Sequence, residues 1–177
     1  NPKGVNIDAY REGLSNAIDP GGFVHYRDMY NYSRGIDEAI DAVEDLLASG
    51  YAAEVVELTE YALSTVETAI GTVDDSDGYM GGILERLQDI HFKACKEARP
   101  DPAGLARRLF EWELRGDWDT FSGAVIKYKN ILGEKGLAVY RSLADAQWEK
   151  VPAVKPGGNS MRCGKDRRLT CIMETLT

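Results

Sequence analysis

The stretch Ile36–Val73, IDEAIDAVEDLLASGYAAEVVELTEYALSTVETAIGTV, decides the fold class of this chain. Its first half carries an apolar residue at every third or fourth position, the spacing of one face of an α-helix: Ile36, Ile40, Val43 and Leu47. Gly50 then suits the left-handed end of a helix, and a second stripe of the same period follows: Val55, Leu58, Ala62, Val66, Ala69 and Val73. Two amphipathic helices so close together predict an antiparallel helical hairpin.

Amphipathic segments of the same kind lie on both sides of this hairpin, each bounded by Gly, Pro or Asp: residues 5–18, 80–95, 102–114, 119–132 and 137–148. Asp101 suits an N-cap, Pro102 suits a first helical turn, and Gly133 is expected to end the helix before it. We expect the second and third segments to pair, and likewise the last two, because a helix with one apolar stripe must bury it. Together with the hairpin of the first stretch, these make three helix pairs, which begin near Asp28, Asp77 and Asp119. The sequence therefore predicts an all-α fold of antiparallel helix pairs, stacked as a TPR-like or HEAT-like α-solenoid.

Residues 1–177 are expected to form a single helical-repeat domain that is a fragment of a longer protein. Two prolines and a pair of glycines predict a loop over residues 151–165, and the apolar spacing of residues 166–177 predicts the start of another helix. Because that stripe is cut off at Thr177, we expect the partner of this helix to lie beyond it.

Charge and cysteine content narrow the class of protein. The 21 Lys and Arg against 29 Asp and Glu give a net charge of -8, which disfavours nonspecific attraction to phosphate backbones or anionic membranes. The charge is uneven, since five basic and two acidic residues follow residue 150 and make a basic tail on an acidic body. Three cysteines without CxxC spacing argue against a disulfide framework. This cysteine pattern favours a reduced, cytoplasmic protein. No apolar run approaches the roughly 20 residues of a membrane span, so we expect no membrane partner.

The residue types that can support catalysis or metal binding are expected to have structural roles here. His91 falls on the apolar stripe of its segment, which favours a hydrogen-bonded core histidine over a general base. The acidic turn Asp74–Asp77 lacks the outer ligands of a calcium loop and suits a helix start. Cation binding at this turn is the alternative that the sequence leaves open. Glu111 and Glu113 lie two apart, point in opposite directions on a helix and flank an expected core residue, Trp112. We predict no enzyme, no cofactor and no metal site.

A set of short motifs resembles an uncharacterised family of bacterial helical domains that is often found downstream of a SWIM-type zinc finger. These motifs are DDSDG at 74–78, ILERL at 83–87 with His91, FEWE at 110–113, DTF at 119–121, LGE at 132–134 and IME at 172–174. The resemblance covers most of the chain from about Gly22 and implies a TPR-like helical solenoid. The paired cysteines and the Cys and His of the SWIM pattern are absent, so its zinc is not carried over.

The predicted architecture favours a non-enzymatic scaffold that binds an unknown protein or peptide partner. The first helix of each pair is expected to line the binding face, and Trp118, in a turn, is expected to pack between repeats or against a partner. The candidate partner-binding residues are Arg34, Asp37, Asp41, Arg86, Asp89, Lys93, Trp118, Lys127 and Lys129. The alternative is an accessory module of a nucleic-acid-binding zinc-finger protein, in which nucleic acid is contacted by the basic tail, Arg162–Arg168, or by other parts of the parent protein.

Overall fold

A computed structural model describes residues 5–19, 29–70, 78–115, 123–150 and 164–176. Within these ranges the regular secondary structure is entirely α-helical, which confirms the predicted fold class. The helices are α1 (Ile7–Ile18), α3 (Met29–Ala48), α4 (Ala52–Ile70), α5 (Tyr79–Ala98), α6 (Pro102–Arg115), α7 (Ala124–Lys127), α8 (Lys129–Glu149) and α9 (Gly164–Leu176). They belong to two compact units, Asn1–Ala98 and Arg99–Thr177, each described in turn below.

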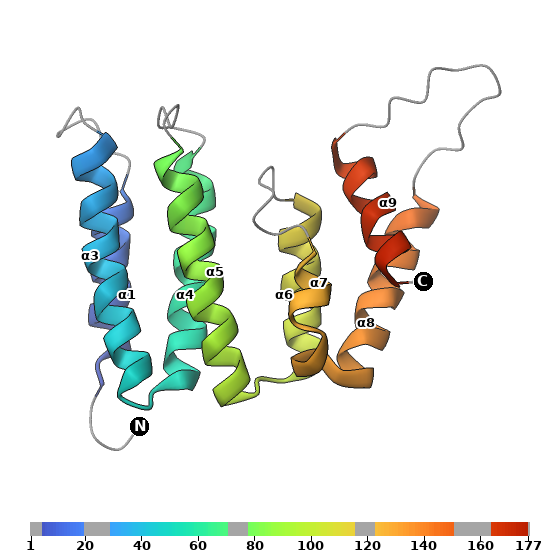
Figure 1. Ribbon diagram of the computed structural model, residues 1–177, viewed down its shortest axis with the longest axis horizontal. Helices are drawn as coiled ribbons and strands as arrows, with labels where there is room; N and C mark the ends of the chain where they lie inside the picture. The colour runs from blue at the N-terminus through green and yellow to red at the C-terminus, as the bar shows by residue number, and fades with distance from the viewer. Residues whose placement is uncertain (1–4, 20–28, 71–77, 116–122, 151–163, 177) are drawn as a thin grey trace. The chain divides into compact units, whose positions relative to one another are not determined.

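The first unit arranges its helices in two layers. Helix α3 lies beside α5 in one layer and α1 lies beside α4 in the other, as Figure 1 shows in blue to green. The most extensive packing joins α4 to α5, and α3 contacts α1, α4 and α5. The expected pairing of the two helices in the stretch Ile36–Val73 is present, but α4 packs more extensively on α5 than on α3.

The apolar stripes expected from the sequence form the core of this unit. Ile36, Ile40 and Val43 of α3 are buried, and Leu46 replaces the predicted Leu47 as the next buried position. Every predicted stripe residue of α4 within the described range is buried: Val55, Leu58, Ala62, Val66 and Ala69. Full burial of a Val, Leu or Ile side chain contributes about 1.5–3 kcal/mol, so these stripes supply the main driving force for packing.

The predicted helix ends are confirmed where the structure describes them. Gly50 follows α3 with φ of 92°, its N–H donates to the carbonyl oxygen of Leu47 at 3.0 Å, and the N–H of Tyr51 donates to that of Leu46 at 3.2 Å. This pair of bonds is the Schellman ending, which satisfies the last carbonyl groups of the helix. Asp101 caps α6, because its Oδ2 accepts the N–H of Gly104 at 3.0 Å.

In the second unit α8 is the central helix. It packs on α6 and α9, and α9 also contacts α6. Gly133 has φ of 61° and ψ of -169°, so the helical path is broken there, as the sequence predicts. Helix α9 begins at Gly164, two residues before the expected start, and buries Leu169 and Ile172. Helices α6 and α8 cover part of this stripe, and the expected further partner beyond Thr177 stays a prediction.

Some predictions are not reached by the structure. Trp118, the acidic turn Asp74–Asp77 and nearly all of the 151–165 loop lie outside the described residues. The expected pairing of residues 80–95 with 102–114 spans the two units, because α5 belongs to the first and α6 to the second. The α-solenoid and the single domain therefore stay predictions.

Close packing around Gly136, within α8 and against the start of α6, yields a stability prediction. A Cβ there would lie 2.8 Å from Cβ of Leu132 and 3.3 Å from the carbonyl oxygen of Pro102. We expect Gly136→Ala to destabilise the protein by about 1–3 kcal/mol through overpacking.

Gly35→Ala is the matched control. It lies inside α3, a Cβ there meets nothing within 4 Å, and we expect it to stabilise the protein by up to about 1 kcal/mol through helix propensity. Urea denaturation followed by circular dichroism measures both changes. Equal effects of the two substitutions would contradict the close packing at Gly136.

Candidate functional site

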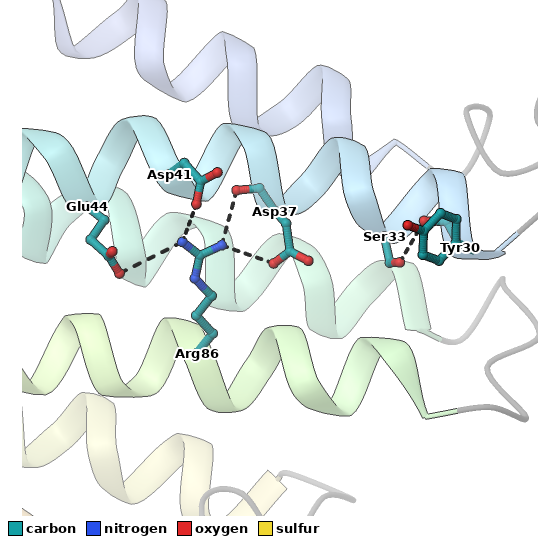
Figure 2. Close-up of polar contacts among 6 residues, drawn as sticks. All are labelled: Tyr30, Ser33, Asp37, Asp41, Glu44 and Arg86. Carbon is teal, nitrogen blue, oxygen red and sulfur yellow. Dashed lines mark hydrogen bonds and ion pairs between the residues drawn. The ribbon is translucent and has the colours of Figure 1, made fainter.

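A cluster of charged side chains joins the two helices of one layer in the first unit. Figure 2 shows Arg86 of α5 pointing toward three carboxylates of α3, those of Asp37, Asp41 and Glu44. The three acids are spaced by four and three residues, so they share one face of α3. They lie next in sequence to Ile36, Ile40 and Val43, which places the acidic row beside the buried stripe.

The guanidinium of Arg86 is divided among several acceptors. Nη1 lies 3.0 Å from Oδ1 of Asp37 and donates to the backbone carbonyl oxygen of Asp37 at 3.1 Å. Nη2 donates to Oδ1 of Asp41 and lies 3.8 Å from Oε2 of Glu44. These contacts hold a long, flexible side chain in one position against α3.

Electrostatics favour the charged form of Arg86, and the cluster as a whole remains acidic. Burial by itself lowers the pKa of Arg86, but the hydrogen bonds and the charges of Asp41 and Asp37 outweigh it, so the pKa is raised. The Arg86 side chain is 28% exposed, whereas Asp37, Asp41 and Glu44 are 48%, 63% and 56% exposed. One cation thus faces three solvent-accessible carboxylates, which leaves a surplus of negative charge at the surface.

The structure brings together three of the predicted partner-binding residues, Asp37, Asp41 and Arg86. Others form pairs within one helix: Arg34 lies 3.6 Å from Glu38, and Lys93 lies 3.0 Å from Asp89. Such exposed pairs one turn apart contribute only a few tenths of a kcal/mol. Lys127 and Lys129 are exposed in the second unit, and Trp118 is outside the described residues.

His91 is a core residue with polar partners, as the sequence predicts. Its ring is fully buried, its Nε2 lies 3.2 Å from Oε1 of Glu60, and Sγ of Cys95 lies 3.5 Å from the same nitrogen. Sγ of Cys95 also lies 3.8 Å from Nδ1 of this ring. These contacts fit a buried polar side chain whose hydrogen-bonding groups are satisfied by its neighbours.

Sequence reasoning missed a buried carboxylate in the second unit. Glu113 is 6% exposed, accepts the hydroxyl of Tyr140 and accepts the N–H of Gly123 at 2.9 Å. Burial raises the pKa of Tyr140, and the adjacent charge and hydrogen bond of Glu113 raise it further. A signal was present in the sequence, since Glu113 lies four residues after Leu109 and so continues the apolar stripe of α6.

Metal binding and membrane insertion find no support among the described residues. Within those ranges, no group of three or more His, Cys, Asp and Glu side chains is placed to hold a metal ion. None of the described helices combines the length and apolar character needed to cross a membrane. The charged cluster around Arg86 joins two helices of the first unit through three ion pairs.

Residues 12–170 match a family of unknown function, DUF6880. The chain belongs to this family. The match spans all the described helices except the first turns of α1 and the last turns of α9. No curated protein and no solved structure matches the chain.

The Arg86 cluster predicts a salt-sensitive contribution to stability. We expect Arg86→Met, which keeps an apolar stem, to destabilise the protein by about 1 kcal/mol at low salt, because three carboxylates then lose their shared cation. The loss should shrink at about 1 M NaCl, where exposed charges are screened. Urea denaturation at both salt concentrations measures it, with Lys93→Met as the control for a pair within one helix. The same loss at both salt concentrations would contradict this interpretation.

The buried tyrosines predict loss of stability at alkaline pH. Burial, with a smaller effect of Asp19, raises the pKa of Tyr32 to about 12, and the pKa of Tyr140 is also raised. An unfolded tyrosine ionises near pH 10, so stability is complete below about pH 10 and falls as the pH rises further, by roughly 1 kcal/mol per pH unit for each tyrosine.

Tyr140→Phe tests this pH dependence in the second unit. At neutral pH the variant should be less stable by about 1–3 kcal/mol, because Glu113 stays buried without the hydroxyl donor. Between about pH 9 and 11 it should lose less stability than the wild type. Thermal unfolding across this pH range measures both effects, and parallel pH profiles would contradict the assignment.

Proposed function

We propose that this protein is a non-enzymatic helical scaffold that binds a protein or peptide partner, with its helices stacked as TPR-like pairs. Layered helices that bury one stripe leave an extended polar face for recognition. The α3 and α5 layer supports the proposal, because it exposes the acidic row beside Arg86 instead of covering it with another described helix of the first unit.

The observation that carries the proposal is the uncompensated negative charge of the unit that contains this layer. Residues 1–98 contain seven Lys and Arg against nineteen Asp and Glu, a net charge of -12. A surface with one sign of charge attracts a partner of opposite charge over several ångströms and speeds its association. We therefore expect the partner to present a basic segment to α3 and α5.

Arg86 prepares the carboxylates for such a partner. It engages one oxygen of Asp37 and one oxygen of Asp41. Within the part of the chain that the structure describes, the second oxygens of these two carboxylates accept no hydrogen bond. A lysine or arginine of the partner can bind them without displacing Arg86, and the fixed positions of the carboxylates reduce the entropy lost on binding.

A titration with a defined basic peptide tests this function. The probe is a fluorescein-labelled peptide of alternating lysine and alanine, added to the full chain and followed by fluorescence anisotropy. We expect Asp37→Asn with Asp41→Asn to weaken binding about tenfold, because two carboxylates at the contact are lost.

The matched control is Glu12→Gln with Glu97→Gln, which removes the same charge from exposed residues outside the acidic row. This control should weaken binding less than twofold, since it changes only the long-range electrostatic field of the protein and not the contact itself. If the two double variants weaken binding equally, attraction is not located at the acidic row and the proposal fails.

The alternative function, an accessory module of a nucleic-acid-binding zinc-finger protein, is favoured by one observation. Residues 99–177 contain fourteen Lys and Arg against ten Asp and Glu, a net charge of +4. A mobility shift with duplex DNA at about 50 mM and about 200 mM salt tests it, because phosphate contacts weaken steeply with salt. The absence of a shift at the lower concentration would reject this alternative.

A further inference from the structure

A small pocket in the second unit lies among α7, α8 and α9. It has a volume of about 140 Å³. Its apolar lining comes from Val125, Ile126, Leu137 and Leu176, and two cationic residues, Lys129 and Arg141, also line it. Ile126 is 64% exposed, which makes it the most exposed large apolar side chain among the described residues.

The two cations that line this pocket are not paired with carboxylates of the described chain. Among the described residues, neither Lys129 nor Arg141 makes an ion pair or a hydrogen bond. Both are exposed, and both belong to α8, on either side of the break at Gly133. The pocket therefore offers an apolar surface beside two positive charges that the described protein does not neutralise.

We propose that this pocket binds a peptide in which one aliphatic residue is flanked by Asp or Glu. The volume suits a single aliphatic side chain, and Lys129 and Arg141 supply the charges that complement the flanking carboxylates. An aliphatic side chain inserted there covers Ile126, whose exposure to water is otherwise unfavourable. This inference rests on the proposed scaffold function and names the chemistry of a second contact, separate from the acidic row.

Other ligands fit the pocket less well. A bare phosphate or nucleic-acid backbone would leave the apolar part of the lining, above all Ile126, exposed to water. A basic segment of the kind expected at α3 would be repelled by Lys129 and Arg141. An acidic peptide with an aliphatic anchor satisfies both the charge and the apolar surface.

Fluorescence anisotropy with the full chain tests the proposal. The probe is a fluorescein-labelled heptapeptide with leucine at its centre and three alternating glutamates and aspartates on each side. We expect Lys129→Gln with Arg141→Gln to weaken binding about tenfold, and Ile126→Ser to weaken it severalfold. Replacing the central leucine of the probe by serine should also weaken binding severalfold.

The matched control is Lys135→Gln with Lys150→Gln, which removes the same charge from exposed positions at or next to α8 that do not line the pocket. This control should change binding less than twofold, and circular dichroism should show that all the variants remain folded. Equal weakening by the two double variants, or indifference to the leucine, would overturn the proposal. Binding of octanoate at this pocket without binding of the peptide would also overturn it.

The two probes separate failure of this inference from failure of the proposed function. If the basic peptide binds at the acidic row and the acidic peptide does not bind, the pocket assignment alone is rejected. If neither peptide binds at the residues named for it, both are rejected.

Discussion

The burial of α4 on three of its sides is the constraint on which the first unit depends. Helix α4 contacts α1, α3 and α5, and nine of its residues are buried. One of these is Thr59, whose hydroxyl donates to the carbonyl oxygen of Val55 at 2.7 Å within the same helix. A polar side chain satisfied inside its own helix places no demand on the neighbours. The other three helices pack on α4 mainly through its apolar side chains, with polar contacts such as that of Glu60 with His91 added to them.

The same geometry places charge where it can serve recognition. On α3, the acidic row follows the buried stripe with an offset of one residue, so the helix that packs against α4 also presents carboxylates at the edge of its layer. Arg86 reaches that row from the neighbouring helix α5. The core contacts fix the two backbones, and the ion pairs then position the exposed groups at little additional cost in entropy.

Local features of the fold could be predicted from the sequence because they depend on neighbouring residues. The stripes of α3 and α4, the Gly50 ending and the Asp101 cap all follow from residues within one or two turns. Packing partners could not be predicted in the same way. The burial of Leu46 rather than Leu47, the docking of α9 and the extensive contact of α4 with α5 depend on which helix faces which. The role of Glu113 was missed because its donors lie ten and twenty-seven residues away in the chain.

The bond from the Gly123 N–H to Glu113 has a consequence for evolution of the chain. It joins two points ten residues apart, so the ends of the intervening segment are held together by the folded second unit. The entropy cost of closing such a ring grows only with the logarithm of its length, and doubling it costs roughly 0.6 kcal/mol. By this argument an insertion between these two anchors adds little closure cost, and the helices on either side can keep their packing.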